Sequence, residues 1–261
     1  MNFYEYLEAT NFTEKLGEGI KVAIIDSGCN SHLPNIKGHY NGFTEKLASM
    51  EDVKDGTGHG TALAHIIYEI VPQADLYICK AINDKNEASM LSVYNSLLYA
   101  IGREVDVVCM SFAGIHELST TTVRLVNRLI DSGAILCASI GNDNKPLLVY
   151  PAFMEGVYAV AGLSKDDLSK KSELSNYPLN EIDFTALGED VQTKWDAVMR
   201  TGTSFSNAIV VGQIAYLLSQ HGLHAKDVTY DWFKQFFKQE HYQTDTGFGS
   251  LYAKVVYNEY D

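Results

Sequence analysis

The chain has 261 residues, of which 46% are hydrophobic and 20% are charged. This length and composition supply a sizeable core and exclude a disordered chain. Asp and Glu number 33 against 20 Lys and Arg, so the net charge is −13. Because an acidic surface repels phosphate backbones, we expect no nucleic-acid partner, and we read the charge as serving solubility before any preference for cationic peptides.

The N-terminal sequence has no basic n-region, no continuous apolar stretch and no small-residue cleavage site, so it does not resemble a secretory signal. No apolar run approaches the length that spans a bilayer, and we therefore expect a cytoplasmic protein without a membrane partner. The four cysteines lack CxxC spacing and form no Cys/His cluster, so they do not suggest a zinc site. We expect no metal site and no cofactor. Cys79, Cys109 and Cys137 lie in apolar runs and are expected to be buried thiols, whereas Cys29 lies in a loop and is expected to be partly accessible.

Short apolar runs alternate with longer helical patterns along the chain. The expected strands are Lys21–Ile25, Leu76–Ala81, Val105–Met110, Ala134–Ile140, Val157–Ala161 and Ile182–Thr185. The expected helices are Thr61–Ile70, Met90–Arg103, Thr120–Ser132 and a last one from Thr203–Ser204 to His221–Gly222. No repeat or linker divides the chain, so we expect one domain over 1–261, with 1–16 as an N-terminal extension.

This alternation predicts an α/β fold in which a mainly parallel sheet carries helices on both faces. The last helix contains NAIVVGQIAYLLSQ and is apolar all round, which predicts a buried central helix. In such sheets the active site lies at the carboxyl ends of the strands. Polar side chains that follow the apolar runs are therefore the candidates for function.

Asp26 ends the first apolar run, and His59 stands between two glycines in DGTGHGTALAHII. Alone, the aspartate is better explained as a turn or cap residue. The glycines permit a sharp turn and leave the imidazole uncrowded, as a general base requires. A loop histidine beside a helix start is an equally good explanation when this segment is taken alone.

Ser204 lies at the entry to the buried helix in MRTGTSFSNAIVVG, and Asn142 follows a strand and a glycine in CASIGNDN. An isolated serine there is best explained as a helix cap, and an isolated asparagine as a turn residue. The free N–H groups and the positive dipole of a helix start also stabilise negative charge that develops beside a serine. The Asn142 amide is a candidate donor to an oxyanion.

Together these segments, in the order Asp, His, Asn, Ser, resemble the subtilase family of serine proteases. The resemblance is carried by VAIIDSG, DGTGHGTALA, VVCMSFAG, ASIGNDN, YPA, FTALG, TGTSFSNAIVVG and TGFGSLYAKVV. It extends from about Gly17 to about Val256. It implies a single-domain subtilisin-like fold with a sheet of about seven strands. It also implies a serine endopeptidase with Asp26, His59 and Ser204 as triad and Asn142 as oxyanion donor.

The resemblance also implies where an extended peptide substrate binds. The implied substrate-binding residues are Asn86, Glu87, Ala88, Ser111, Phe112, Ala113, Gly114, Ile140, Gly141 and Val149. Val149 replaces a glycine that is frequent in the family at the floor of the first specificity pocket, which favours a small P1 side chain. Asp143 beside Asn142 instead favours a basic P1, so both preferences stay open.

Departures from the family pattern suggest how the activity is used. A calcium-binding loop is missing after the helix that follows His59, and Asn35 replaces an Asp ligand, so we expect no calcium there. The chain starts too close to Asp26 to include the usual propeptide. We therefore expect a specific processing peptidase, for example one that removes a leader from a precursor peptide, rather than an enzyme of broad intracellular protein turnover.

Two further alternatives remain at this point. A subtilase fold can serve as a non-catalytic binding module, whose signature is a broken triad; all three triad residues are present here. Esterase or acyl transferase chemistry uses the same groups and is not distinguished from proteolysis by the sequence.

Overall fold

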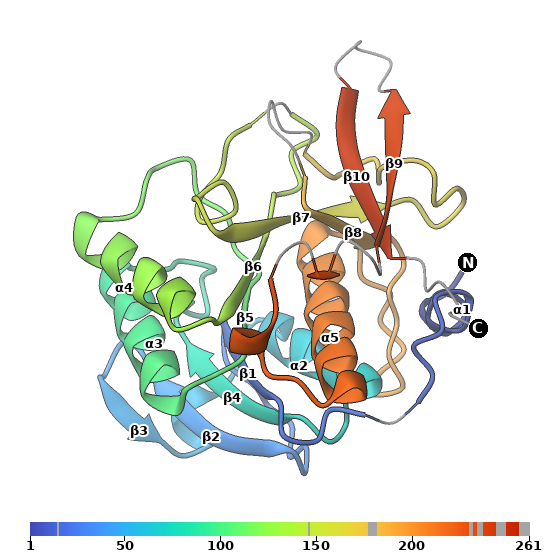
Figure 1. Cartoon of the computed structure of the whole chain (residues 1–261). Coiled ribbons are helices and arrows are strands. Elements are labelled where there is room, and N and C mark those ends of the chain that lie inside the picture. Colours follow the sequence, from blue (N-terminus) through green and yellow to red (C-terminus); the bar gives the residue numbers. More distant parts are fainter. Residues whose placement is uncertain are drawn as a thin grey trace.

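The computed structural model describes residues 1–14, 16–145, 147–176, 182–229 and 232–233, together with the backbone of 237–243 and 249–255. A twisted sheet lies at its centre with helices on both sides (Figure 1). The strands are β1 (Lys21–Asp26), β2 (Ile36–Asn41), β3 (Lys46–Ala48), β4 (Asp75–Lys80), β5 (Val107–Met110), β6 (Ile135–Ser139), β7 (Val157–Leu163), β8 (Phe184–Leu187), β9 (Phe237–Gln243) and β10 (Gly249–Val255). The helices are α1 (Phe3–Ala9), α2 (His59–Ile70), α3 (Met90–Arg103), α4 (Thr120–Asp131) and α5 (Thr203–His221), with 3-10 turns at Glu51–Val53 and Ala225–Asp227.

The described strands form one sheet in the order β3-β2-β4-β1-β5-β6-β7-β8-β10-β9. Neighbours from β2 to β10 pair in parallel, and β3 and β9 are added antiparallel at the two edges. The predicted α/β class and mainly parallel sheet are confirmed. The short edge strand β3 and the β9–β10 ribbon extend the sheet beyond the seven or so strands expected.

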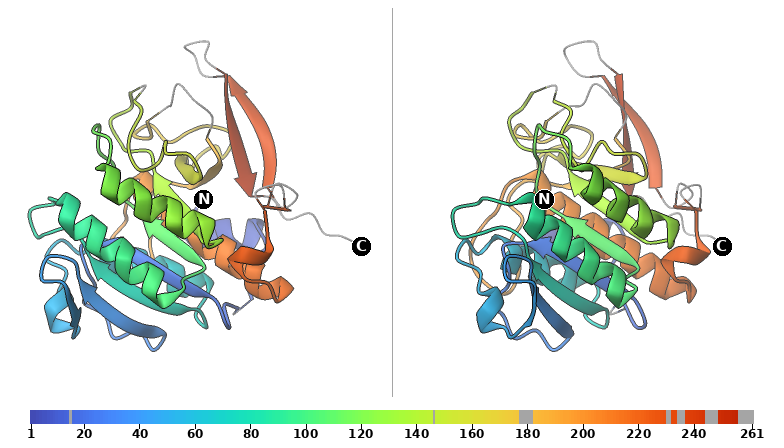
Figure 2. Two further views of the ribbon diagram at one scale, coloured as in Figure 1. Left: turned by 60° about the vertical axis from the view of Figure 1, so that its left-hand side comes forward. Right: turned by 90° about the vertical axis from the view of Figure 1, so that its left-hand side faces the viewer.

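Helices cover the two faces of the sheet in pairs, α2 with α5 and α3 with α4 (Figure 2). Helix α5 is buried from Thr203 to Leu218, which confirms the predicted central helix. It packs closely on α2: a Cβ on Gly212 would lie only 2.7 Å from Cδ1 of Ile70. Because α2 begins at His59 and α5 begins just before Ser204, this contact sets the spacing of two candidate catalytic helices.

The sequence missed α1, β2 and β3. Helix α1 begins with a capping box, in which the Asn2 side chain accepts from the Glu5 N–H at 2.9 Å and the Glu5 carboxylate accepts from the Asn2 N–H at 2.8 Å. Phe3, Tyr6 and Leu7 of this helix are buried in the same apolar cluster as α5. The N-terminal extension therefore contributes to the core.

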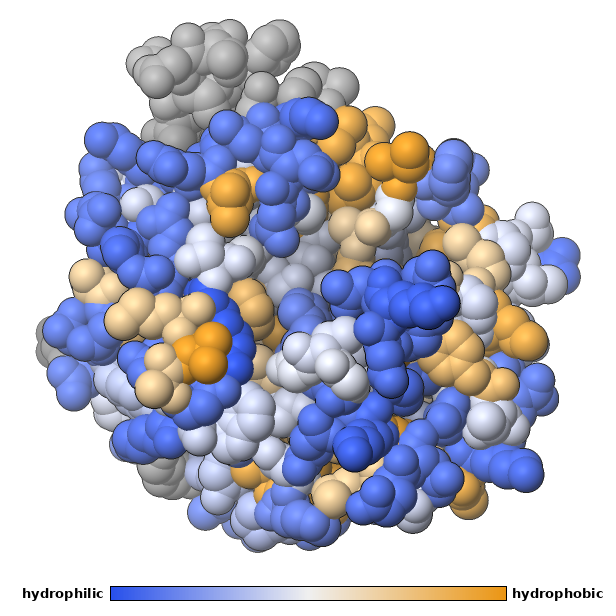
Figure 3. Space-filling model, turned by 180° about the vertical axis from the view of Figure 1, so that it is seen from behind, coloured by the Kyte–Doolittle hydropathy of each residue, from blue (hydrophilic) through white to orange (hydrophobic). Residues whose placement is uncertain are grey.

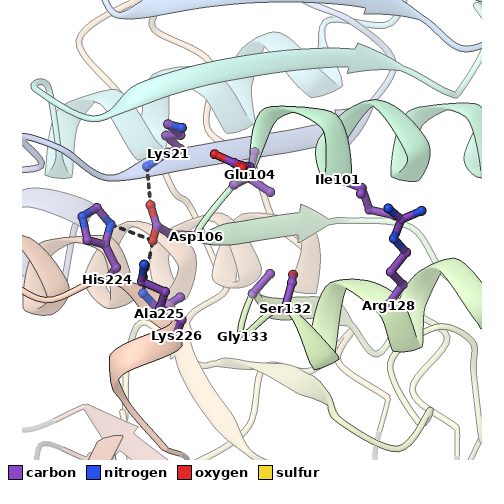
Figure 4. A pocket seen from close by; sticks show the side chains of 12 residues that line it. Lys21, Ile101, Glu104, Asp106, Arg128, Ser132, Gly133, His224, Ala225 and Lys226 are labelled. Atoms are coloured by element: carbon purple, nitrogen blue, oxygen red, sulfur yellow. Dashed lines mark hydrogen bonds and ion pairs between the residues drawn. The ribbon is translucent and has the colours of Figure 1, made fainter.

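At the amino ends of the strands, Asp106 connects three segments of the chain (Figure 4). Its carboxylate accepts from the Lys21 N–H at 3.0 Å and from the Ala225 N–H at 3.1 Å, and it lies 3.1 Å from His224 Nδ1. A cavity of about 460 Å³ opens beside it, lined also by Glu104, Arg128 and Lys226. This cavity is large, but it lies at the amino ends of the strands, whereas the candidate catalytic residues lie at the carboxyl ends.

On the face shown in Figure 3, hydrophobic residues appear in small groups among hydrophilic ones. Within the described ranges, no helix has both the length and the apolar character needed to cross a membrane.

Cys29 corrects one expectation from the sequence. We expected it to be partly accessible, but its side chain is 0% exposed. Its N–H donates to the carbonyl of Val53 at 3.0 Å, so the segment before α2 folds over it. Burial raises the pKa of its thiol to about 11, so the thiolate is disfavoured. Cys79, Cys109 and Cys137 are buried and free as predicted.

Candidate active site

Asp26 and His59 meet at the carboxyl end of β1. Asp26 is the last residue of β1, and His59 is the first residue of α2. Their side chains form a hydrogen bond of 2.7 Å between Asp26 Oδ1 and His59 Nδ1. Asp26 is 1% exposed and the His59 side chain is 28% exposed, so the imidazole is partly open to solvent while the carboxylate is shielded. Asp26 Oδ1 also accepts from the N–H and hydroxyl of Ser27.

The loop before His59 is organised by a second buried carboxylate, Asp55. Its Oδ1 accepts from the Thr57 N–H and hydroxyl and from the Gly58 N–H, at 2.8–3.0 Å. Its Oδ2 accepts from the N–H and hydroxyl of Thr61 at 2.9 and 2.6 Å. Burial alone would raise the pKa of Asp55, but these hydrogen bonds outweigh burial and hold that pKa below its ordinary value. Asp55 therefore fixes the turn that presents His59.

The environment of His59 raises its pKa. Burial alone would lower the pKa of the imidazole, but the charge of Asp26 and the hydrogen bond to it outweigh burial. Arg200 opposes this rise through its positive charge, and Asp55 adds to it. A positioned histidine whose charged form is stabilised by a buried aspartate is suited to accept a proton from a nucleophile.

Ser204 lies in the first turn of α5 and is 8% exposed. Its hydroxyl donates to the carbonyl of Ser111 at 3.1 Å, and the Ser111 hydroxyl donates to the carbonyl of Ser204, also at 3.1 Å. Among the hydrogen bonds of the described residues, none joins Ser204 Oγ to His59. The next residue, Phe205, lies beside His59, and their ring centroids are 5.6 Å apart. The Ser204 hydroxyl is thus bonded to the backbone of Ser111 and not to the imidazole.

Asn142 lies on an exposed loop after β6, beside the start of α5. Its Oδ1 accepts from the Thr203 N–H at 2.8 Å, and the Gly141 N–H donates to the Thr203 hydroxyl at 3.2 Å. A Cβ on Gly202 would lie 3.1 Å from Asn142 Nδ2. Because Oδ1 accepts from Thr203, the amide is oriented so that Nδ2 remains as a donor next to the segment that leads into Ser204.

The expected substrate walls lie in two loops at the same end of the sheet. Gly114 pairs with Tyr150, through N–H to carbonyl bonds of 3.0 and 2.8 Å. Glu87 closes a tight turn with Asn83, whose amide donates to the Glu87 carboxylate at 3.0 Å. The substrate-binding roles stay predictions for Asn86, Glu87, Ala88, Ser111, Phe112, Ala113, Gly114 and Gly141.

Val149 and Ile140 are buried in the apolar cluster on the α3–α4 side of the sheet, at 3% and 0% exposure. A buried valine at this position is compatible with a shallow first pocket. The P1 preference implied by Val149, and the opposing one implied by Asp143, both remain predictions.

Metal ligation was not predicted, and the described residues contain no group of three or more His, Cys, Asp or Glu side chains that suits a metal ion. Asn35 is 5% exposed, and its Nδ2 donates to the carbonyl of Ala74 at 2.9 Å. The residue is therefore used in joining β2 to the segment before β4.

The model of the subtilase family matches residues 17–240, so the chain belongs to that family of serine endopeptidases. An intracellular serine protease of Paenibacillus polymyxa is 28% identical over 221 residues, which cover 77% of this chain and 67% of the relative. The major intracellular serine protease of Bacillus subtilis (strain 168) is 30% identical over 226 residues, covering 78% of this chain and 69% of the relative.

A solved structure also shares the fold. It is described as the crystal structure of a lanthipeptide protease, with a TM-score of 0.75 over 95% of this chain and 92% of that chain. The two sequences are 21% identical in this comparison. The subtilisin-like fold predicted from the sequence is thereby confirmed.

Proposed function

We propose that this chain cleaves peptide bonds with Asp26, His59 and Ser204 as its catalytic triad. The observation that carries the proposal is the 2.7 Å hydrogen bond from a strand-end aspartate to the histidine that starts α2. Ser204 lies in the first turn of the neighbouring helix α5, and the ring of Phe205 adjoins that of His59. By resemblance to the family, Ser204 corresponds to the nucleophile, His59 to its base and Asp26 to the acid that orients the base.

The chemistry follows from these positions. Ser204 Oγ attacks the peptide carbonyl carbon while its proton passes to His59 Nε2, and the carbonyl oxygen becomes an oxyanion. The Asn142 side-chain amide donates to that oxyanion. His59 then returns the proton to the leaving amine as the C–N bond breaks. Water hydrolyses the acyl-enzyme in a second cycle with the same proton carrier, and Ser204 is regenerated.

The hydrogen bond from Ser204 to Ser111 suggests what the substrate does on arrival. The Ser111 carbonyl lies on the expected wall, where an extended peptide can offer a backbone N–H in place of the Ser204 hydroxyl. Such an exchange frees Ser204 to turn towards His59. Substrate binding and nucleophile alignment are then coupled.

The finer role that we propose is processing of a specific precursor peptide inside the cell. Two relatives are named intracellular proteases, and a structure with this fold is named a lanthipeptide protease. Within this chain, the support is Val149, whose burial is compatible with a shallow first pocket that limits the accepted P1 side chains. A leader-bearing peptide is therefore the first substrate to test, ahead of nucleic acids, which the charge of −13 disfavours.

Labelling with a fluorophosphonate tests the triad. The wild-type chain should be labelled stoichiometrically, and Ser204→Ala should not be labelled at all. Equal labelling of both proteins would place the reactive group elsewhere, and no labelling of a folded wild-type chain would favour the non-catalytic binding module.

Comparison of substrates tests the processing role. Peptide termini generated in a cell extract by the wild-type enzyme, but not by Ser204→Ala, should share one short motif. Rapid digestion of casein and of many unrelated proteins would contradict the processing role and leave broad protein turnover as the function.

A further inference from the structure

Asn176 lies behind the loop that carries Asn142. It is 0% exposed and belongs to the segment between β7 and β8, far from Asn142 in the sequence. The loop that it contacts begins where β6 ends at Ser139 and contains Ile140, Gly141 and Asn142. Nothing in the local sequence marks this asparagine as functional.

The Asn176 side chain brackets Asn142 with hydrogen bonds on both sides. Before Asn142, Asn176 Nδ2 donates to the carbonyl of Ile140 at 2.8 Å, and the Asn176 N–H donates to the carbonyl of Gly141 at 3.0 Å. After Asn142, Asn176 Oδ1 accepts from the N–H groups of Asp143 and Lys145 at 2.9 and 3.1 Å. One buried residue thus satisfies four backbone groups of the loop, and buried backbone groups are costly to leave unpaired.

Gly141 fits closely against this bracket. It has a φ of +87°, which side-chain-bearing residues rarely adopt, and a Cβ there would lie 2.6 Å from Asn176 Nδ2. The loop backbone therefore passes Asn176 at a distance that only glycine permits. Asn142 itself is exposed, so its position depends on its own bond to Thr203 and on these backbone contacts, and not on burial.

We propose that Asn176 is a positioning residue that holds the Asn142 amide where the oxyanion forms. The inference rests on the proposed function of Asn142. A preorganised donor stabilises a transition state because it is already in place when charge develops, and a displacement of about 1 Å can cost roughly 10²-fold in rate. Asn176 makes no contact with substrate in this role and acts only through the loop.

The test is a double-mutant cycle between Asn176→Asp and Asn142→Ala, with kcat and KM measured on one peptide substrate. Asn176→Asp keeps the shape and the acceptor oxygen but loses the donor to the carbonyl of Ile140. We expect Asn142→Ala to lower kcat by about 10²–10³-fold. We expect Asn176→Asp to lower kcat by roughly 10–10²-fold with KM little changed. In the Asn142→Ala background, the same substitution should change kcat less than about threefold, because the donor is already gone.

Asn95→Asp is the matched control. Asn95 is also a buried asparagine that donates to a backbone carbonyl, that of Gly42 at 2.9 Å, but it lies in α3, outside the loop that carries Asn142. It should lower the melting temperature to a similar extent and leave kcat unchanged. Rates are expressed per active site titrated with fluorophosphonate, so that loss of folded protein is not counted as loss of turnover.

Two results would overturn the proposal. One is an unchanged kcat in Asn176→Asp. The other is a loss of kcat on Asn176→Asp substitution that is equally large in the wild-type and Asn142→Ala backgrounds. If Asn176→Asp does not fold, Gly141→Ala disturbs the same contact from the opposite side, and its loss of kcat should likewise vanish in the Asn142→Ala background. Full turnover by Asn142→Ala would refute both roles in the oxyanion site, while fluorophosphonate labelling would still report independently on Ser204.

Discussion

A buried aspartate is paired with a histidine at each end of the parallel strands. At the carboxyl ends, Asp26 Oδ1 lies 2.7 Å from His59 Nδ1, and at the amino ends, Asp106 Oδ1 lies 3.1 Å from His224 Nδ1. Asp106 has both oxygens engaged by neighbouring groups, including two backbone N–H groups. The Asp26 carboxylate makes its side-chain hydrogen bonds through Oδ1, and its buried Oδ2 has no hydrogen-bond partner among the described residues.

The same two residue types therefore do different work. The Asp106 pair closes a junction between β1, the segment before β5 and the segment after α5, so both carboxylate oxygens are used for structure. The Asp26 pair leaves Oδ2 without a hydrogen-bond partner and lies beside Phe205, the residue that follows Ser204. An Asp–His contact alone does not identify a catalytic site. The groups around the pair distinguish a structural contact from a catalytic one.

The largest expected contrast lies between the two histidines. His59→Ala should lower kcat by roughly 10⁶-fold, as the same loss does in a subtilisin, because the serine loses its base. His224→Ala should leave kcat within about twofold and affect only stability. Steady-state hydrolysis of one peptide measures both, and a comparable loss of kcat in the two variants would erase the distinction between the two ends of the strands.

A smaller contrast is expected between the aspartates. Asp26→Asn should lower kcat by about 10⁴-fold, because the imidazole loses the partner that selects its tautomer and stabilises its charged form. Asp106→Asn should retain kcat but lower the free energy of unfolding by about 1–3 kcal/mol, because buried donors lose an acceptor. Urea denaturation and kinetics separate the two effects. Retained activity in a folded Asp26→Asn variant would contradict the triad.

Val149→Gly should alter specificity rather than turnover of the best substrate. Removing the side chain enlarges the first pocket, so kcat/KM for a large P1 residue should rise about 10-fold or more relative to alanine at P1. Val105→Ala is the control, because Val105 is a buried valine that lines the cavity at the amino ends of the strands. Cleavage-site sequencing in a peptide library measures the change. Identical P1 profiles in the wild type and both variants would show that Val149 does not line the pocket.

The pH dependence should show the smallest effect. Activity requires neutral His59, so kcat/KM should fall with decreasing pH through a pKa above the ordinary histidine value of about 6.5, because the charge of Asp26 and the hydrogen bond to it raise it. The same raised pKa stabilises the folded state at low pH, and that contribution is lost as pH rises through it. Activity and this part of stability therefore change in opposite directions. An acidic limb below pH 6 would show that burial outweighs Asp26.

Much of the fold was predictable because its strands are apolar runs and its helices follow a regular period. The strand from Lys21 and the helix at Met90–Arg103 were predicted closely. Strand β2 was missed because IKGHYN has mostly half-buried residues and no apolar run. Helix α1 was missed because its burial depends on packing against distant α5.

The candidate site was predictable only as far as its motifs are local. Asp26, His59, Asn142 and Ser204 each stand in a recognisable segment. Asp55 lies inside the quoted DGTGHGT segment, yet its five hydrogen bonds appear only in three dimensions. Ser111 as the partner of Ser204 depends on contacts between residues far apart in the chain, which no spacing rule reveals.

The contact between Gly212 and Ile70 lies in the interior of the protein, between α5 and α2. The helices that carry His59 and Ser204 touch where one of them has no side chain, so their contact leaves no room for a larger residue. A methyl group added at Gly212 would lie 2.7 Å from Cδ1 of Ile70, so the Ile70 side chain or one of the two helices would have to shift. Selection for activity in such an enzyme should therefore act on this interior position as strongly as on residues that meet the peptide.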